Sequence, residues 1–196
     1  MAATVVFVVW CGLCPSLHSP LPIHRIPQTM NPLASRLSLA LALAAIPSAS
    51  HAVNYVWNGN NADWSTPSEW TPAGPPTGGA GNYAIINSGT ANLTSNAASV
   101  QDILVNTTGI INGTGTVNHT AGSISATGWT RMGRGTGGVA TYNLSGTGSL
   151  TTARLIVAES SNANFAMTGG TLQVNGELWV GGNSATIGQA GTITFS

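Results

Sequence analysis

The amino-acid sequence predicts an all-β fold, a single-stranded β-helix (β-solenoid) that we expect to be right-handed and to carry a tryptophan-rich N-terminal cap. The first observation is a recurring apolar unit. Leu155-Ile156-Val157-Ala158 returns 23 positions later as Leu178-Trp179-Val180-Gly181, and Thr130-Arg131-Met132-Gly133 precedes it by 25 positions. The second observation is the filler between the copies, which is rich in the turn residues Gly, Asn, Ser and Thr. Such repeats are typical of solenoids, in which each coil buries its apolar side only against its neighbours.

The first 52 residues are expected to be processing sequence. Residues 30–52 have the order of a signal peptide, with Arg36, an apolar stretch over 37–46, a breaker at Pro47 and small residues before a cleavage point after Ala52. The apolar stretch is too short to span a bilayer, so no membrane span is expected in the mature chain. Residues 1–29 are interpreted as an over-extended gene start. The mature protein should therefore begin at Val53.

Charge is scarce, and this excludes several classes of function. The chain has five basic and five acidic residues among 196, and its net charge is zero. A nucleic-acid partner is not expected, because binding to phosphates requires a basic surface, and neither is a polybasic membrane anchor. The two cysteines, Cys11 and Cys14, lie in the leader. Stability of the exported chain must therefore come from stacking of coils rather than from disulfides.

Residues 53–91 are predicted to form the N-terminal cap, since they lack the repeat and contain Trp57, Trp64 and Trp70 in a loop-rich stretch. Solenoids cover their open ends because an uncovered coil exposes core side chains and unpaired strand edges. Residues 92–196 are predicted to form the repeats. They end within a strand pattern at Ser196, so we expect a truncated C-terminus and a remainder in a longer polypeptide.

Alternation within the repeat predicts which side chains face the core. A coil of about 23 residues has room for about three short strands, and coils should stack about 4.8 Å apart. The second residue of each copy should point outward and form a column along the surface. The core columns are expected to contain the first and third residues of each copy: Ile103, Thr130, Leu155 and Leu178, and Val105, Met132, Val157 and Val180. The outward column is expected to contain Leu104, Arg131, Ile156 and Trp179.

Motifs that suggest chemistry have simpler structural interpretations. Gly133, Gly135 and Gly138 match G-x-G-x-x-G, but the residues that follow predict a strand rather than the helix that a dinucleotide site needs, so we interpret them as a corner. Asp63 and Glu69 could be imagined as a glycosidase pair, and we interpret them as turn residues. No catalytic, cofactor-binding or metal-binding residue is predicted.

Histidine and asparagine also receive structural interpretations. His119 is the only histidine after the leader, so no histidine-rich metal site is expected, and we interpret it as a solvated turn residue. Five N-x-S/T sequences, at positions 92, 106, 112, 118 and 143, are attributed to the Asn- and Thr-rich composition rather than to glycosylation.

Tryptophan supplies an alternative function, because indole faces stack on sugar rings. Trp179 and Arg131 are candidate glycan contacts on the outward column. Trp57, Trp64 and Trp70 are further candidates, although the need to close the coil favours packing for them. A polysaccharide-binding module is thus the alternative to a scaffold, and a β-helix polysaccharide lyase or hydrolase comes after it.

Several motifs together resemble a known family. They are Trp57-Asn58-Gly59, Asp63-Trp64-Ser65, Trp70 and Pro76 in the cap, then Gly128-Trp129-Thr130-Arg131-Met132-Gly133 and Tyr142-Asn143-Leu144-Ser145-Gly146 in the repeats. On these residues the chain resembles exported bacterial β-solenoid proteins with autotransporter-associated or PEP-CTERM-type β-strand repeats. The resemblance implies a non-enzymatic, passenger-like scaffold with a structural or adhesive role, secreted or displayed on the cell surface. Its expected partners are extracellular polysaccharide or the cell envelope.

Overall fold

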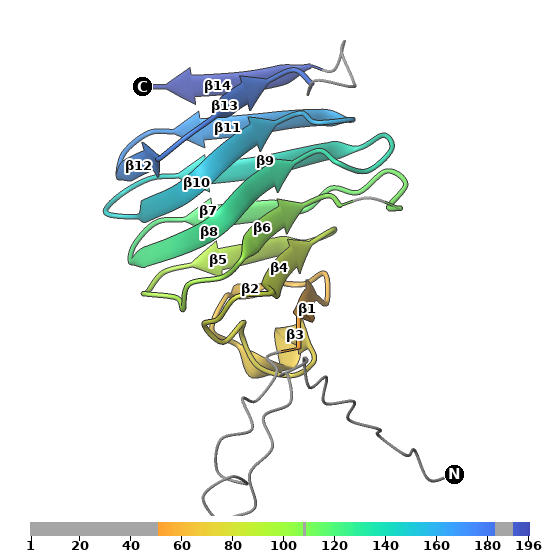
Figure 1. Ribbon diagram of the computed structural model, residues 1–196, viewed down its shortest axis with the longest axis vertical. Helices are drawn as coiled ribbons and strands as arrows, with labels where there is room; N and C mark the ends of the chain where they lie inside the picture. Colours follow the sequence, from red (N-terminus) through yellow and green to blue (C-terminus); the bar gives the residue numbers. More distant parts are fainter. Residues whose placement is uncertain (1–50, 108, 183–189) are drawn as a thin grey trace, which may run out of the picture. The chain divides into compact units, whose positions relative to one another are not determined.

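A computed structural model describes residues 51–107, 109–182 and 190–196. The predicted gene start, nearly all of the predicted signal peptide and both cysteines lie outside the described residues. Within the described part, the regular secondary structure is almost entirely β-strand, and the strands stack as parallel coils (Figure 1). The predicted β-solenoid is confirmed, with about five turns.

The strands form two sheets that run the length of the stack. The first sheet contains β1 (Val53–Trp57), β3 (Trp70–Thr71), β4 (Asn82–Ile86), β6 (Asp102–Val105), β8 (Ser123–Met132), β10 (Ser149–Val157), β12 (Thr171–Val174) and β13 (Leu178–Val180). The second sheet contains β2 (Asn61–Asp63), β5 (Thr90–Leu93), β7 (Thr116–His119), β9 (Val139–Leu144), β11 (Asn162–Met167) and β14 (Gly191–Phe195). A short 3-10 turn, η1 (Pro67–Glu69), precedes β3. Every pairing is parallel except that of β1 with β3.

Each C-terminal coil has three strand segments, as its length predicts. Two of them run together in β10, where the register shifts between Thr152 and Arg154, and the third is β11. The next coil separates the same two segments into β12 and β13, which pair with the two halves of β10. The long strands of this sheet are therefore pairs of short strands joined without a turn.

The predicted register of the repeat is confirmed. Leu155 pairs with Thr130 on one side and Leu178 on the other, and Thr130 pairs with Ile103. The core columns are fully buried over the central coils, because each side chain is covered by its counterparts above and below. The hydroxyl of buried Thr130 is hydrogen-bonded to that of Thr152 at 3.1 Å, which explains how a polar side chain can occupy a core column.

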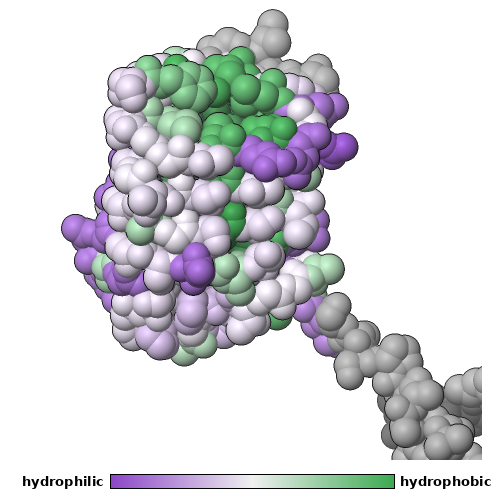
Figure 2. All heavy atoms as spheres, turned by 90° about the vertical axis from the view of Figure 1, so that its left-hand side faces the viewer, coloured by the Kyte–Doolittle hydropathy of each residue, from purple (hydrophilic) through white to green (hydrophobic). Residues whose placement is uncertain are grey.

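The last coil departs from the predicted burial. Leu178 and Val180 lie in the core columns by register but are 48% and 49% exposed, because no described strand lies beyond them. Phe195 in β14 is 64% exposed. Figure 2 shows hydrophobic colour gathered at this end of one face, whereas the lower coils on that face are mostly pale.

The predicted cap, residues 53–91, contains strands of the same ladder as the repeats. Strand β1 already pairs in parallel with β4, with Tyr55 beside Ala84, and β2 pairs with β5. The parallel ladder therefore begins at β1, within the stretch that the sequence assigns to the cap. The intervals from Tyr55 to Ala84 and on to Ile103 are 29 and 19 residues, and this irregularity hides the repeat in the sequence.

Asparagines form a ladder on the outer face of the second sheet. Asn92, Asn118 and Asn143 are register partners in β5, β7 and β9. The Asn143 side chain donates to that of Asn118 at 2.9 Å, and Asn118 donates to Asn92 at 3.1 Å. Three of the five N-x-S/T sequences therefore contain stacked asparagines, a more specific reason for their presence than composition.

Candidate functional site: a groove on the first sheet

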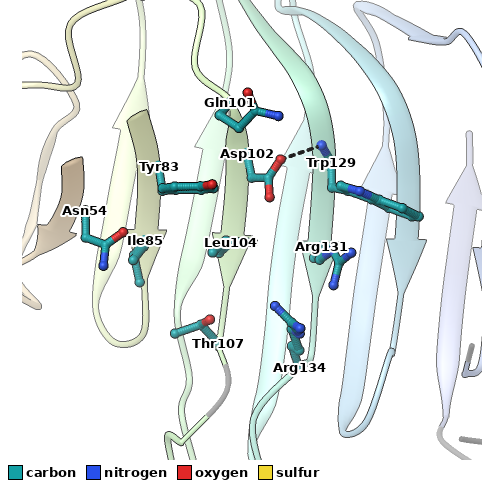
Figure 3. A pocket seen from close by; sticks show the side chains of 10 residues that line it. All are labelled: Asn54, Tyr83, Ile85, Gln101, Asp102, Leu104, Thr107, Trp129, Arg131 and Arg134. Atoms are coloured by element: carbon teal, nitrogen blue, oxygen red, sulfur yellow. Dashed lines mark hydrogen bonds between the residues drawn. The ribbon is translucent and has the colours of Figure 1, made fainter. Parts of the chain in front are cut away.

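A groove of about 590 Å³ lies on the outer face of the first sheet (Figure 3). Its walls come from neighbouring coils, β1, β4, β6 and β8, from the residue before β6 and from the loops that follow β6 and β8. The lining is mostly polar. It consists of Asn54, Tyr83, Ile85, Gln101, Asp102, Leu104, Thr107, Trp129, Arg131 and Arg134.

Strand alternation places these side chains outside. In β6, Ile103 points into the core, so Asp102 and Leu104 on either side of it point outward. In β8, buried Thr130 likewise separates Trp129 from Arg131. Stacking of coils then brings outward residues from different parts of the sequence into adjacent rows.

A local irregularity ties Asp102 to the next coil. One oxygen of its carboxylate accepts the backbone N–H of Trp129 at 2.8 Å. A Cβ at Gly128 would displace the ends of the Gln101 and Asp102 side chains, so glycine leaves room for this close approach. Burial raises the pKa of Asp102 above its ordinary value, and the bond from Trp129 together with Arg131 and Arg134 opposes this shift only in part.

Trp129 is the centre of an aromatic and cationic cluster. The guanidinium carbons of Arg131 and Arg154 lie 4.4 and 4.7 Å from its ring centroid, within the range of cation–π contacts. The Trp179 ring lies 6.1 Å away in an edge-to-face arrangement. Since the two indoles come from the coils on either side of β10, they meet over that strand.

The burial of the outward column differs from its prediction. Ile156, expected on the exposed outward column, is only 1% exposed, and Leu104 in the same column is 8% exposed. Both point away from the core and are nevertheless buried. The outward column is therefore a second, smaller packed layer rather than an open stripe.

Ion pairs border the groove. Glu159 is 3.3 Å from Arg131 and 3.5 Å from Arg134, and its side chain is 7% exposed. Arg154 pairs with Glu177 at 3.5 Å, where both side chains are about half exposed. The three arginines of the described chain thus each have a carboxylate partner, which lowers the net charge that a ligand would meet.

The structure brings only two of the candidate glycan contacts to this face. Arg131 lines the groove, and Trp179 reaches its neighbourhood through Trp129. The other three candidates, Trp57, Trp64 and Trp70, are 3%, 4% and 2% exposed, so their rings are not available for stacking on a sugar. Their prediction as glycan contacts is therefore wrong for this structure, and the packing interpretation holds.

Asp63 and Glu69 form hydrogen bonds within turns and to neighbouring segments, in line with their interpretation as turn residues. Asp63 accepts hydrogen bonds from the hydroxyls of Ser65 and Thr94, both at 2.5 Å. These bonds hold the pKa of Asp63 below its ordinary value, since they stabilise the ionised carboxylate. Glu69 accepts a bond from the Asn60 amide at 2.9 Å. Both carboxylates have roles in local structure.

His119 is not the solvated turn residue that the sequence suggested, because it is fully buried in β7. Its Nε2 lies 3.0 Å from the carbonyl of Gly122, which can only accept, so Nε2 carries a proton. Its Nδ1, 3.0 Å from the Tyr142 hydroxyl, then accepts from that hydroxyl in the neutral ring. Burial lowers the pKa of His119 and favours this neutral form.

Acid is therefore expected to weaken the fold through His119. An unfolded histidine binds a proton below about pH 6.5, whereas the buried one resists it, so stability is full above that pH and falls as the pH drops below it. Unfolding by urea at about pH 8 and about pH 5.5 should show a loss of at most about 1.4 kcal/mol per pH unit. In the His119→Gln variant this dependence should disappear. An unchanged slope in that variant would refute the assignment.

The glycines of the G-x-G-x-x-G match lie at a corner, as predicted. Gly133 and Gly138 are in the turn between β8 and β9, both at positive φ. A Cβ at either position would collide with a backbone carbonyl of an adjacent coil, that of Ser161 or of Gly113. Close backbone approach between coils explains these glycines.

Two kinds of site are not found among the described residues, a metal centre and a membrane-spanning helix. No three His, Cys, Asp or Glu side chains in this part of the chain come together as metal ligands would. Among the same residues there is also no helix of sufficient length and hydropathy to cross a membrane.

Sequence reasoning missed most of the groove, although a signal was present. The residue that precedes each copy of the repeat points outward too, and at successive copies this position contains Asp102, Trp129, Arg154 and Glu177. Three of these four residues are charged, whereas only one of the four residues at the second position is. Tyr83, the register partner of Asp102, extends the same row into the preceding coil.

Comparison with known proteins found no family model that matches the chain, no similar curated protein and no solved structure that resembles it significantly. The resemblance to bacterial repeat proteins stays a prediction.

Proposed function

We propose that the protein is a non-enzymatic scaffold, exported by a bacterial cell and either secreted or held at the cell surface, with a structural or adhesive role. The observation that carries this proposal is the continuous ladder of core side chains, from Tyr55 in β1 to Leu155 in β10. A solenoid of this kind presents two continuous outer faces and needs very few charged residues to do so.

The contacts of the charged side chains support a scaffold. Glu159 joins two arginines, Glu177 joins a third, and Asp63 caps a turn. General acid–base catalysis instead needs a carboxyl group placed to exchange a proton with a substrate. These carboxylates link strands and loops of the solenoid to one another, and such links stabilise a scaffold.

Export is tested by the N-terminus of secreted material. When the full chain is expressed in a bacterial host, the protein recovered outside the cytoplasm is expected to begin at Val53, because a signal peptide ends at Ala52. Mass spectrometry of the intact protein measures this directly. Peptides from residues 1–29 in the exported protein, or retention of the whole product in the cytoplasm, would contradict the proposal.

Polysaccharide binding is the second candidate function, and the groove favours it. Two aromatic rings, two arginines and several hydroxyl and amide groups surround one depression, and such groups bind sugars in concave sites. Co-sedimentation of the exported protein with insoluble polysaccharides tests this function, and release of reducing sugar in the same samples tests for a lyase or hydrolase. We expect sedimentation without release.

A further inference from the structure

We propose that the groove on the first sheet binds an uncharged oligosaccharide that lies along the axis of the solenoid. This inference rests on the second proposed function and specifies its site and the class of its ligand. Three features of the groove carry it: its length, its balance of charge and the polar groups that remain open to a ligand.

The length of the groove fits a chain of sugars. Its lining includes Asn54, Tyr83, Asp102 and Trp129, which come from strands of successive coils. Since parallel strands lie about 4.8 Å apart, these four residues span about 14 Å. A single sugar ring would contact only one or two coils. An oligosaccharide that crosses the strands would contact all of them.

The balance of charge favours an uncharged ligand. The two arginines of the lining, Arg131 and Arg134, both pair with buried Glu159, and Asp102 adds a second carboxylate. Two positive and two negative charges thus meet at the groove. An acidic polysaccharide would have to compete with Glu159 for the guanidinium groups and would approach Asp102. A neutral sugar avoids both costs.

The remaining polar groups are of the type that hydroxyl groups bind. Figure 3 shows the second oxygen of the Asp102 carboxylate directed away from its bond to Trp129, with the Tyr83 ring on the adjacent strand. Asn54, Gln101 and Thr107 add amide and hydroxyl groups on the same walls. Each can accept from or donate to a sugar hydroxyl.

Titration calorimetry of the exported protein tests the proposal. The probes are unbranched neutral hexasaccharides of glucose, xylose and mannose, and an acidic hexasaccharide of galacturonate. We expect a neutral probe to bind with an affinity that does not fall when salt is raised, because no charges are paired on binding. The acidic probe should bind more weakly than the neutral one.

Two conservative variants locate the site. Tyr83→Phe removes a hydroxyl, and Asp102→Asn keeps an acceptor for the Trp129 N–H while it removes the charge. Each is expected to weaken binding of the neutral probe about tenfold, the effect of one lost hydrogen bond to the ligand. Thr116→Val, on the outer face of the second sheet, is the matched control and should leave the affinity unchanged.

The outcomes separate this inference from the proposed function. If the acidic probe binds more tightly and its affinity falls with salt, the protein binds polysaccharide but the ligand class is wrong. If a neutral probe binds equally to the wild type and to both groove variants, the location is wrong. If no probe binds and insoluble polysaccharides do not sediment the protein, the binding function itself fails.

Discussion

Replacement of Trp70 by alanine is expected to lower the free energy of unfolding by about 3 to 5 kcal/mol. The Trp70 indole lies between two others, with ring centroids 5.0 Å from Trp57 and 4.8 Å from Trp64, both edge to face. Its Nε1 donates to the carbonyl of Trp64 at 2.7 Å. The substitution thus removes two ring contacts and a buried hydrogen bond, and leaves a cavity at the first coil.

Chemical denaturation monitored by circular dichroism measures this loss. Trp179→Ala is the matched control, because that indole is only partly buried and makes one ring contact, with Trp129. Replacement of Trp179 should lower the free energy of unfolding clearly less than replacement of Trp70. Equal losses in the two variants would show that the cluster of the first coil is not the packing centre that its burial indicates.

Replacement of Phe165 by alanine should also have a large effect and lower the free energy of unfolding by about 3 to 5 kcal/mol. Phe165 is 1% exposed in β11, and its ring is stacked on that of Tyr142 at 5.3 Å with an angle of 14° between the planes. Tyr142 in turn bonds to His119, so the cavity would open beside a buried polar pair. Local collapse would disturb that pair as well.

Phe195→Ala provides the comparison within the same sheet. Phe195 lies in β14, the neighbour of β11, but is 64% exposed. Its removal should change stability by less than about 1 kcal/mol, since little buried surface is lost. Thermal melting of both variants measures this difference. A larger fall in melting temperature for Phe195→Ala than for Phe165→Ala would show that the core is wrongly assigned.

The sequence determined the fold class and the register of the repeat. Because side chains alternate along a strand, the copies that begin at Thr130, Leu155 and Leu178 could be aligned residue by residue, and they pair in that register. The same alternation separated core from outward positions. It could do so because parallel stacking places equivalent residues directly above one another.

The extent of the ladder could not be predicted. The first coils contain the same strands, but their spacing of 29 and then 19 residues differs from the 23 to 27 of the later copies. Loops of variable length are tolerated at corners because a longer loop costs little additional entropy. Because the loops of the first coils differ in length, the number of residues per coil is not constant there, and the sequence shows no regular repeat.

Burial outside the periodic pattern was decided only by the tertiary structure. His119 is buried and hydrogen-bonded to Tyr142, which lies 23 positions away in the next coil. Ile156 is buried on the outer side of β10, the strand between those of Trp129 and Trp179. The sequence fixes the row in which a side chain stands. Contacts between rows depend on the length and direction of side chains from different coils, and only the stacked structure brings those together.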